Sequence, residues 1–182
     1  MAAVIQPKRD ALVPIWRKHL EYEFTTRDTA ATIATMTDDA YVNHIPVMTG
    51  GFGKDALREF YARHFIHQMP PDTTITPLSL TIGDAQVVDE MIFEFTHTIA
   101  MGWMLPGIAP TGKHVSVPLV AIVSFRDGKV AHEHIYWDQA SVLAQIGLLD
   151  STKLPIAGGA TAAKARNPQL PSNLLIKRAG TR

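Results

Sequence analysis

Cysteine is absent from the 182 residues, and this absence excludes disulfide bonds, thiolate metal sites and a cysteine nucleophile. The chain also lacks an apolar run of about 18 residues, the length that a membrane-spanning helix needs. Its N-terminus lacks the basic region and apolar segment of a secretory signal. We therefore expect a cytoplasmic protein that does not enter a membrane.

Acidic residues are missing from residues 151–182. All 17 acidic residues lie in 1–150 with 11 of the 17 basic ones, a net charge of 11 − 17 = −6, and the other six basic residues give 151–182 a charge of +6. This basic segment has no aromatic residue, whereas nucleic-acid surfaces usually interleave basic and aromatic side chains. We expect no nucleic-acid partner, and a tail that packs on its own acidic body or on a partner subunit.

The composition is that of a globular chain, with 46% hydrophobic and 19% charged residues, and its length suits one domain. We divide it into an N-terminal arm (1–13), an α+β domain (14–149) and a basic, irregular tail (150–182). Within the tail, the apolar segment 173–176 is expected to dock on a surface groove, either of this chain or of a neighbouring subunit.

Helical patterns come first along the chain. Pro14 suits the first position of a helix, and Trp16, Leu20 and Phe24 recur at i, i+4 and i+8, which predicts a helix over about 14–26. Asp28 can cap a second helix that ends near residue 36. A third helix is predicted from apolar spacing at i, i+3, i+4, i+7 and i+8: Leu57, Phe60, Tyr61, His64 and Phe65.

Strand patterns follow, over about 40–46, 74–82, 86–101, 114–126 and 129–138. The turn signals at 83–85 and 127–128 predict hairpins, so the last three long strands form an antiparallel meander. Helices followed by such strands predict an α+β fold with the helices on one face of a curved antiparallel sheet. The 114–126 strand is apolar on both faces, which suggests burial on both sides and a homodimer.

The stretch from His132 to Asp138 carries the chemistry. His132, His134, Tyr136 and Asp138 alternate, so they share one face of a strand, while the other face holds Ala131, Glu133, Ile135 and Trp137. Two imidazoles, a phenol and a carboxylate on one face form an acid/base set. Asp138 also stands where the next helix begins, so it can act as an N-cap as well.

The order of elements and several motifs resemble the SnoaL-like polyketide cyclases of the nuclear transport factor two-like superfamily. The motifs are Phe125-Arg126-Asp127-Gly128-Lys129-Val130, Tyr136-Trp137-Asp138, Leu143-Ala144-Gln145-Ile146-Gly147, Asp38-Asp39-Ala40-Tyr41-x-x-His44, and Gly53, Ala56, Leu57 and Phe60. The resemblance covers about 14–149. It implies a cone-shaped curved antiparallel sheet with N-terminal helices packed on its concave face. It also implies that Asp138 points into the cone as general acid/base.

The resemblance implies a cofactor-free enzyme that transfers a proton next to the carbonyl of a small apolar substrate, as an aldol-type cyclase, isomerase or dehydratase. Asp138 would be the base, and His134 and His44 would orient or donate. The candidate substrate-binding residues are Tyr41, Tyr136, His97, Trp103, Trp16, Phe60 and His132.

Other interpretations remain open. His132 and His134 with His44 or a glutamate could bind a metal, but the resembling fold normally works without one, so we predict no metal site. A non-catalytic small-molecule binder of the same fold and an epoxide or lactone hydrolase are the alternative functions.

Overall fold

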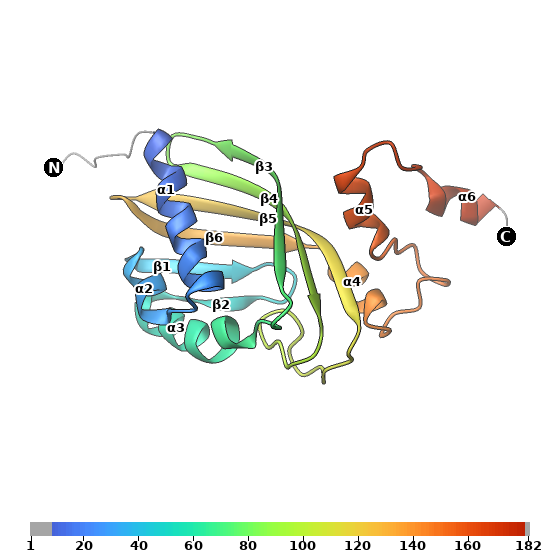
Figure 1. Cartoon of the computed structure of the whole chain (residues 1–182), viewed down its shortest axis with the longest axis horizontal. Helices are drawn as coiled ribbons and strands as arrows, with labels where there is room; N and C mark the ends of the chain where they lie inside the picture. The colour runs from blue at the N-terminus through green and yellow to red at the C-terminus, as the bar shows by residue number, and fades with distance from the viewer. Residues whose placement is uncertain (1–8, 181–182) are drawn as a thin grey trace.

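The computed structural model describes residues 9–180, in which helices cover one face of a curved sheet (Figure 1). Helix α1 (Arg9–Leu20) continues into a π-helical turn, η1 (Glu21–Thr25). Pro14 was predicted to begin the helix, but it lies inside α1, which starts five residues earlier. The next helix, α2 (Thr29–Ala34), begins as predicted, because the Asp28 side chain accepts a hydrogen bond from the Ala31 N–H at 2.9 Å.

The third predicted helix is present in three consecutive parts. Helix α3 (Gly53–Phe60) continues into a second π-helical turn, η2 (Tyr61–Phe65), and then into a short 3-10 helix, η3 (Ile66–Gln68). Leu57, Phe60, Tyr61 and Phe65 are buried as the apolar spacing predicted. His64, the fifth member of that pattern, is exposed.

The sheet has six strands in the order β2-β1-β6-β5-β4-β3. Their bounds are β1 (Met36–His44), β2 (Thr49–Phe52), β3 (Thr74–Ile82), β4 (Gln86–Thr96), β5 (His114–Arg126) and β6 (Lys129–Trp137). The predicted meander is confirmed, since β4, β5 and β6 pair antiparallel. The sheet is not antiparallel throughout, because β1 pairs with β6 in parallel. A parallel pair requires a long connection along the chain. Here that connection includes all the elements from β2 to β5.

The core lies between the concave face of the sheet and the helices. Alternate residues of β5, from Val115 to Phe125, are buried in this core, while the intervening residues are only partly buried. The loop after β4 closes one end of the core, because its apolar side chains Met101, Trp103, Met104 and Leu105 are all buried. The loop therefore covers one end of the space between the sheet and the helices.

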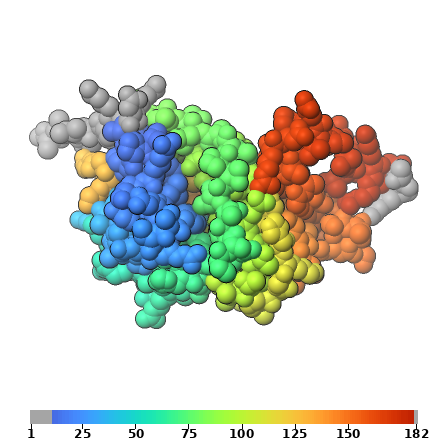
Figure 2. Space-filling model, viewed as in Figure 1, coloured from blue at the N-terminus to red at the C-terminus, as the bar shows by residue number. Residues whose placement is uncertain are grey.

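The chain after β6 contains α4 (Gln139–Gln145), α5 (Ala160–Arg166) and α6 (Leu174–Gly180). The tail is therefore not wholly irregular, since it holds two short helices. It packs against its own body: α5 contacts β5, and Arg166 forms an ion pair with Glu94 of β4. Figure 2 shows the tail as a lobe on one side of the molecule.

The apolar segment 173–176 was expected to dock in a groove. Leu174 and Ile176 are 55% and 71% exposed in the single chain, so docking on a neighbouring subunit stays a prediction. No helix among residues 9–180 is both long enough and apolar enough to cross a membrane.

Candidate functional site

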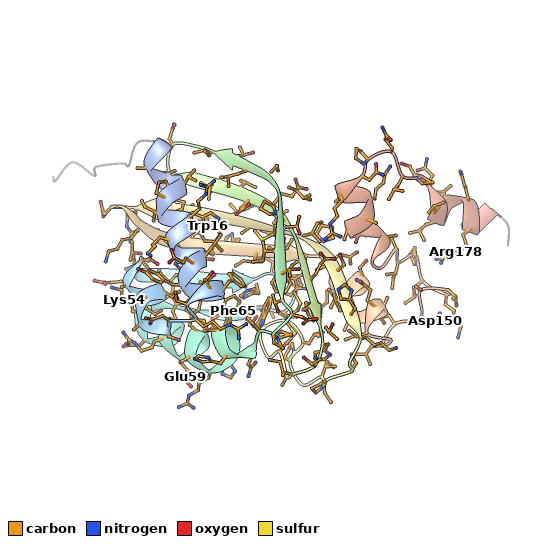
Figure 3. The ribbon with its side chains drawn as sticks, viewed as in Figure 1. Trp16, Lys54, Glu59, Phe65, Asp150 and Arg178 are labelled. Atoms are coloured by element: carbon orange, nitrogen blue, oxygen red, sulfur yellow. The ribbon has the colours of Figure 1, made fainter. Side chains whose placement is uncertain are left out.

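A small cavity lies between the helices and the concave face of the sheet. Water-sized spheres can occupy about 40 Å³ of it, which is room for about three water molecules, since one needs roughly 10–15 Å³ on this measure. Trp16 of α1 and Phe65 of η2 form part of its wall (Figure 3). The wall is mostly apolar, and its ionisable residues are Glu23, His44, Tyr61 and Glu133.

The orientation of β6 is opposite to the prediction. Glu133 and Ile135 line the cavity, whereas His132, His134 and Tyr136 lie on the outer face and Asp138 is exposed. The Asp138 carboxylate caps α4, accepting hydrogen bonds from the Ser141 N–H at 3.0 Å and the Ser141 hydroxyl at 2.6 Å. Its inward orientation, predicted from the resemblance, is wrong, because the apolar face of β6 is the one that packs in the core.

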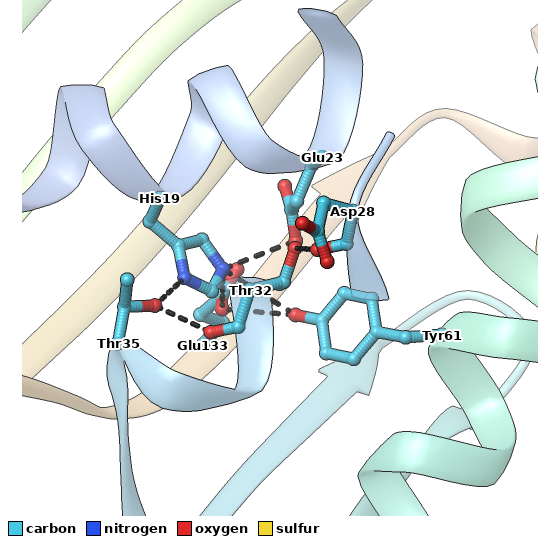
Figure 4. A network of polar contacts seen from close by, with 7 residues as sticks. All are labelled: His19, Glu23, Asp28, Thr32, Thr35, Tyr61 and Glu133. Atoms are coloured by element: carbon cyan, nitrogen blue, oxygen red, sulfur yellow. Dashed lines mark hydrogen bonds and ion pairs between the residues drawn. The ribbon is translucent and has the colours of Figure 1, made fainter. Parts of the chain in front are cut away.

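A buried polar cluster, consisting of His19, Glu23, Tyr61 and Glu133, meets the cavity (Figure 4). His19 Nε2 lies 3.1 Å from one carboxylate oxygen of Glu23 and 3.1 Å from one of Glu133. The Tyr61 hydroxyl donates to the same Glu133 oxygen at 3.3 Å. Three different parts of the chain thus bring four ionisable side chains into one water-poor space.

Thr35 fixes the orientation of the His19 ring. The Thr35 hydroxyl donates to the Thr32 carbonyl at 2.6 Å, so its oxygen accepts a hydrogen bond from His19 Nδ1 at 2.5 Å. With Nδ1 acting as a donor, Nε2 faces the two carboxylates. This geometry holds the imidazole in the one orientation that serves both glutamates.

Two π-helical turns contribute to the cluster. Glu23 lies in η1, and Tyr61 begins η2. A π turn contains one residue more per turn than the α-helix around it and is frequent at functional sites. In this chain, the turns carry polar residues to the edge of otherwise apolar helix faces.

The protonation of the cluster follows from its burial and charges. Burial lowers the pKa of His19, but the carboxylates of Glu23 and Glu133 outweigh it and raise that pKa to about 10. Burial raises the pKa of the Glu23 carboxyl, against the opposing effect of His19. Burial and the two carboxylates also raise the pKa of Tyr61. At neutral pH the cluster therefore combines an imidazolium and a neutral phenol with the two glutamates.

The same cluster has the donors for a metal ion. The ligand atoms of His19, Glu23 and Glu133 lie within 4.8 Å of one another, and imidazole with carboxylates suits zinc, iron or manganese. This set differs from the His132 and His134 combination that the sequence suggested. Those two rings lie on the outer face of β6, whereas His44 is buried inside.

Of the predicted residues, His44, Trp103 and Trp16 line the cavity. The Trp16 indole N–H donates to Asp89 at 2.8 Å. Phe60 packs against the His44 ring, with centroids 5.5 Å apart, but is not part of the cavity wall. His97 is buried away from the cavity, where its Nδ1 lies 3.2 Å from the Thr111 hydroxyl.

The remaining predicted residues gather on the outer face of the sheet. Tyr41 stacks on His132 with ring centroids 4.8 Å apart, and His134 lies 5.5 Å from Tyr41. Tyr136 is 40% exposed. The structure therefore separates the predicted set into an inner group and an outer group.

Sequence reasoning missed His19, Glu23, Tyr61 and Glu133 as functional candidates, although each left a signal. His19 and Glu23 are spaced i, i+4 beside the apolar stripe of the first helix. Glu133 alternates with Ala131, Ile135 and Trp137, so it is a charged residue on an otherwise apolar strand face. A glutamate in such a position is expected to be buried with the rest of that face. A buried carboxylate requires polar partners, so it marks a candidate site.

Comparison with known proteins agrees with this architecture. A family model described as a SnoaL-like domain matches residues 16–133, which is more than half of the chain. A search of curated protein sequences found no match to this chain.

Solved structures share the fold at low identity. A proposed SnoaL-like polyketide cyclase from Jannaschia sp. CCS1 is 18% identical with a TM-score of 0.65, over 82% of this chain and 100% of that one. TsrD from Streptomyces laurentii is 19% identical with a TM-score of 0.60, over 79% and 99%. AclR from Streptomyces galilaeus, a proposed hydroxylase, is 17% identical with a TM-score of 0.60, over 79% and 89%. The match of the family model and the shared cone-shaped α+β fold show that this chain belongs to the SnoaL-like family.

Proposed function

We propose that the protein is an acid/base enzyme that moves a proton next to the carbonyl group of a small apolar substrate bound in the cavity. The observation that carries this proposal is the buried cluster at the cavity, where Glu133, Glu23 and Tyr61 line an apolar space. His19 contacts both glutamates from behind this wall. A water-poor site strengthens each electrostatic interaction inside it. The cluster replaces Asp138 as the proton-transfer group of the sequence hypothesis.

The roles within the cluster follow from the contacts. Glu133 lines the cavity and is held by both Tyr61 and His19, so we assign the base to Glu133. Glu133 would accept the proton from the carbon next to the substrate carbonyl. The electron pair of that C–H bond would form the C=C bond, and the π pair of the carbonyl would move to its oxygen as an enolate. Tyr61, kept neutral by its raised pKa, would hydrogen-bond that oxygen. Return of the proton to carbon restores the ketone or yields an isomer.

Substrate must displace part of the cavity wall, because about 40 Å³ holds only a few water molecules. Leu20, Phe24 and Ile75 line the cavity and are partly exposed, so they form its outer wall. A shallow groove between α1 and β3 shares Leu20 and Ile75 with the cavity. We propose that substrate enters there.

Proton exchange tests this function without knowledge of the natural substrate. A panel of small cyclic ketones is incubated with the protein in D₂O, and deuterium incorporation next to the carbonyl is followed by NMR. We expect catalysed exchange with at least one ketone, and a decrease of about 10²- to 10⁴-fold in Glu133→Gln, the usual range for loss of a general base. Full exchange in that variant would contradict the proposal.

Two controls separate the rival assignments. Asp138→Asn keeps a good helix cap outside the cavity, so we expect it to retain exchange, and a loss there would return the base to Asp138. Dialysis against EDTA should leave exchange unchanged, and a dependence on metal would show that His19, Glu23 and Glu133 act as ligands instead. Ligand binding without any exchange by the unaltered protein would identify a non-catalytic binder.

A further inference from the structure

Two buried polar groups on the cavity wall have no role in the proton-transfer cluster. They belong to His44 of β1 and Trp103 of the apolar loop, which are each 2% exposed and have ring centroids 5.1 Å apart. Phe60, Phe65 and Trp137 surround His44 at centroid distances of 5.5–5.7 Å. The polar atoms of this pair therefore lie in an aromatic environment.

Thr49 holds both residues. Its backbone carbonyl oxygen lies 3.2 Å from His44 Nδ1. A carbonyl oxygen can only accept, so Nδ1 carries the proton, and in the neutral ring Nε2 is an acceptor. The Thr49 hydroxyl donates to the Trp103 carbonyl oxygen at 2.6 Å. One residue thus fixes the tautomer of the imidazole and anchors the backbone of the tryptophan.

The remaining ring nitrogens of the pair lack partners among residues 9–180. Trp103 Nε1 is buried and makes no hydrogen bond there. The His44 ring makes its only hydrogen bond to a described residue through Nδ1, which leaves Nε2 unused. A buried donor without a partner costs roughly 1–3 kcal/mol, so a ligand that accepts from Trp103 Nε1 is favoured. The same ligand can donate to the free Nε2 of His44.

His44 stays neutral in this environment. Burial lowers its pKa to about 4, against the opposing effects of the Thr49 carbonyl and the Glu133 charge. The sequence hypothesis treated His44 as an orienting or donor group. With Nδ1 occupied and no second proton at neutral pH, its free nitrogen accepts and does not donate.

We propose that His44 and Trp103 form a recognition pair for a hydroxy-carbonyl compound, whose hydroxyl donates to His44 Nε2 and whose carbonyl oxygen accepts from Trp103 Nε1. This inference rests on the proposed function for its carbonyl substrate and specifies that substrate further. Donor and acceptor groups on one ligand match the acceptor and donor groups of the pair. A ketone without the hydroxyl would leave Nε2 unpaired.

Binding of small probes tests the pair without any turnover. The probes are 3-hydroxy-2-butanone, its methyl ether 3-methoxy-2-butanone, and 2-butanone, titrated into the full chain labelled with ¹⁵N at histidine. We expect the hydroxy-ketone to shift the His44 Nε2 resonance and to bind about fivefold more tightly than the other two, as one neutral hydrogen bond allows. The free protein should show a neutral His44 with its proton on Nδ1.

Matched aromatic variants assign each hydrogen bond. His44→Phe should abolish the preference for the hydroxy-ketone and leave 2-butanone affinity unchanged. Trp103→Phe should weaken all three ketones by a similar factor and keep the preference. Asp138→Asn, which lies outside the cavity, should keep both effects and serves as the control for substitution.

Three results would overturn the proposal: a His44 proton on Nε2, equal affinity for all three probes, or a preference that persists in His44→Phe. The ring measurement needs no variant, so misfolding of a substituted protein cannot conceal the answer. Failure of ketone exchange in the unaltered protein would disprove the proposed function. The probe titration would still test the recognition pair, because it measures binding without turnover.

Discussion

The inner and outer faces of β6 both carry titratable residues, but these residues differ in burial and in their contacts. On the inner face, Glu133 is 3% exposed and contacts the buried His19 ring. On the outer face, His132 and His134 contact each other and Tyr41 at the partly exposed surface of the sheet. A titratable residue therefore acquires its burial and its close ionic partners from its side of the sheet, and its type alone does not decide this.

The largest difference between the faces should appear when a histidine is removed from each. His19→Ala leaves the carboxylates of Glu23 and Glu133 buried without their cation, and such a loss costs about 3–5 kcal/mol. His134→Ala removes ring contacts on the outer face and should cost less than about 1 kcal/mol. Urea unfolding at pH 7 measures both, and equal losses would show that the cluster does not stabilise the fold.

The second effect concerns His44 and the acid side of the stability profile. The pKa of His44 is about 4 in the folded protein, against 6.5 for a histidine exposed to water, so below pH 6.5 the unfolded chain takes up a proton that the folded chain does not. Stability should decrease between pH 6.5 and about 4, by roughly 3 kcal/mol from this residue at 1.36 kcal/mol per pKa unit. Denaturant unfolding across this range, compared with His44→Phe, isolates the contribution, and parallel curves would refute it.

The smallest effect should belong to Asp138. Asp138→Ala removes the side-chain cap of α4 and should cost about 1 kcal/mol, whereas Asp138→Asn retains an N-cap residue and should cost little. Thermal unfolding of the two variants measures the difference. If Asn is as harmful as Ala, the carboxylate itself matters, and a role beyond capping must be sought.

Periodicity in the sequence predicted the fold because helices and strands obey local rules. The spacing of Trp16, Leu20 and Phe24 and the β5 strand from His114 to Arg126 agree with the structure. The parallel pairing of β1 with β6 did not follow from any local pattern, because strand partners distant in sequence are chosen by tertiary packing. The homodimer and the absence of a nucleic-acid partner stay predictions.

The site was harder to predict because it depends on which face of β6 points inward. Polar residues with familiar chemistry drew attention to His132, His134 and Asp138, and the resemblance supported the same face. The apolar alternation of Ala131, Ile135 and Trp137 indicated the opposite orientation. Burial of apolar surface is the dominant driving force in folding, so the face that could fill a core was the inward one, and it carried Glu133 with it.

The π turn η1 (Glu21–Thr25) gives the site a particular sensitivity to insertions and deletions. Each residue of an α-helix advances the chain by about 100°. Deleting Tyr22, which precedes Glu23 in η1, would turn Trp16 and His19 by that angle relative to Glu23 and Phe24, although no side chain of the site would change. The cluster is therefore encoded in the length of this segment as well as in its composition, and natural relatives that lack the extra residue should have lost the pairing of His19 with Glu23.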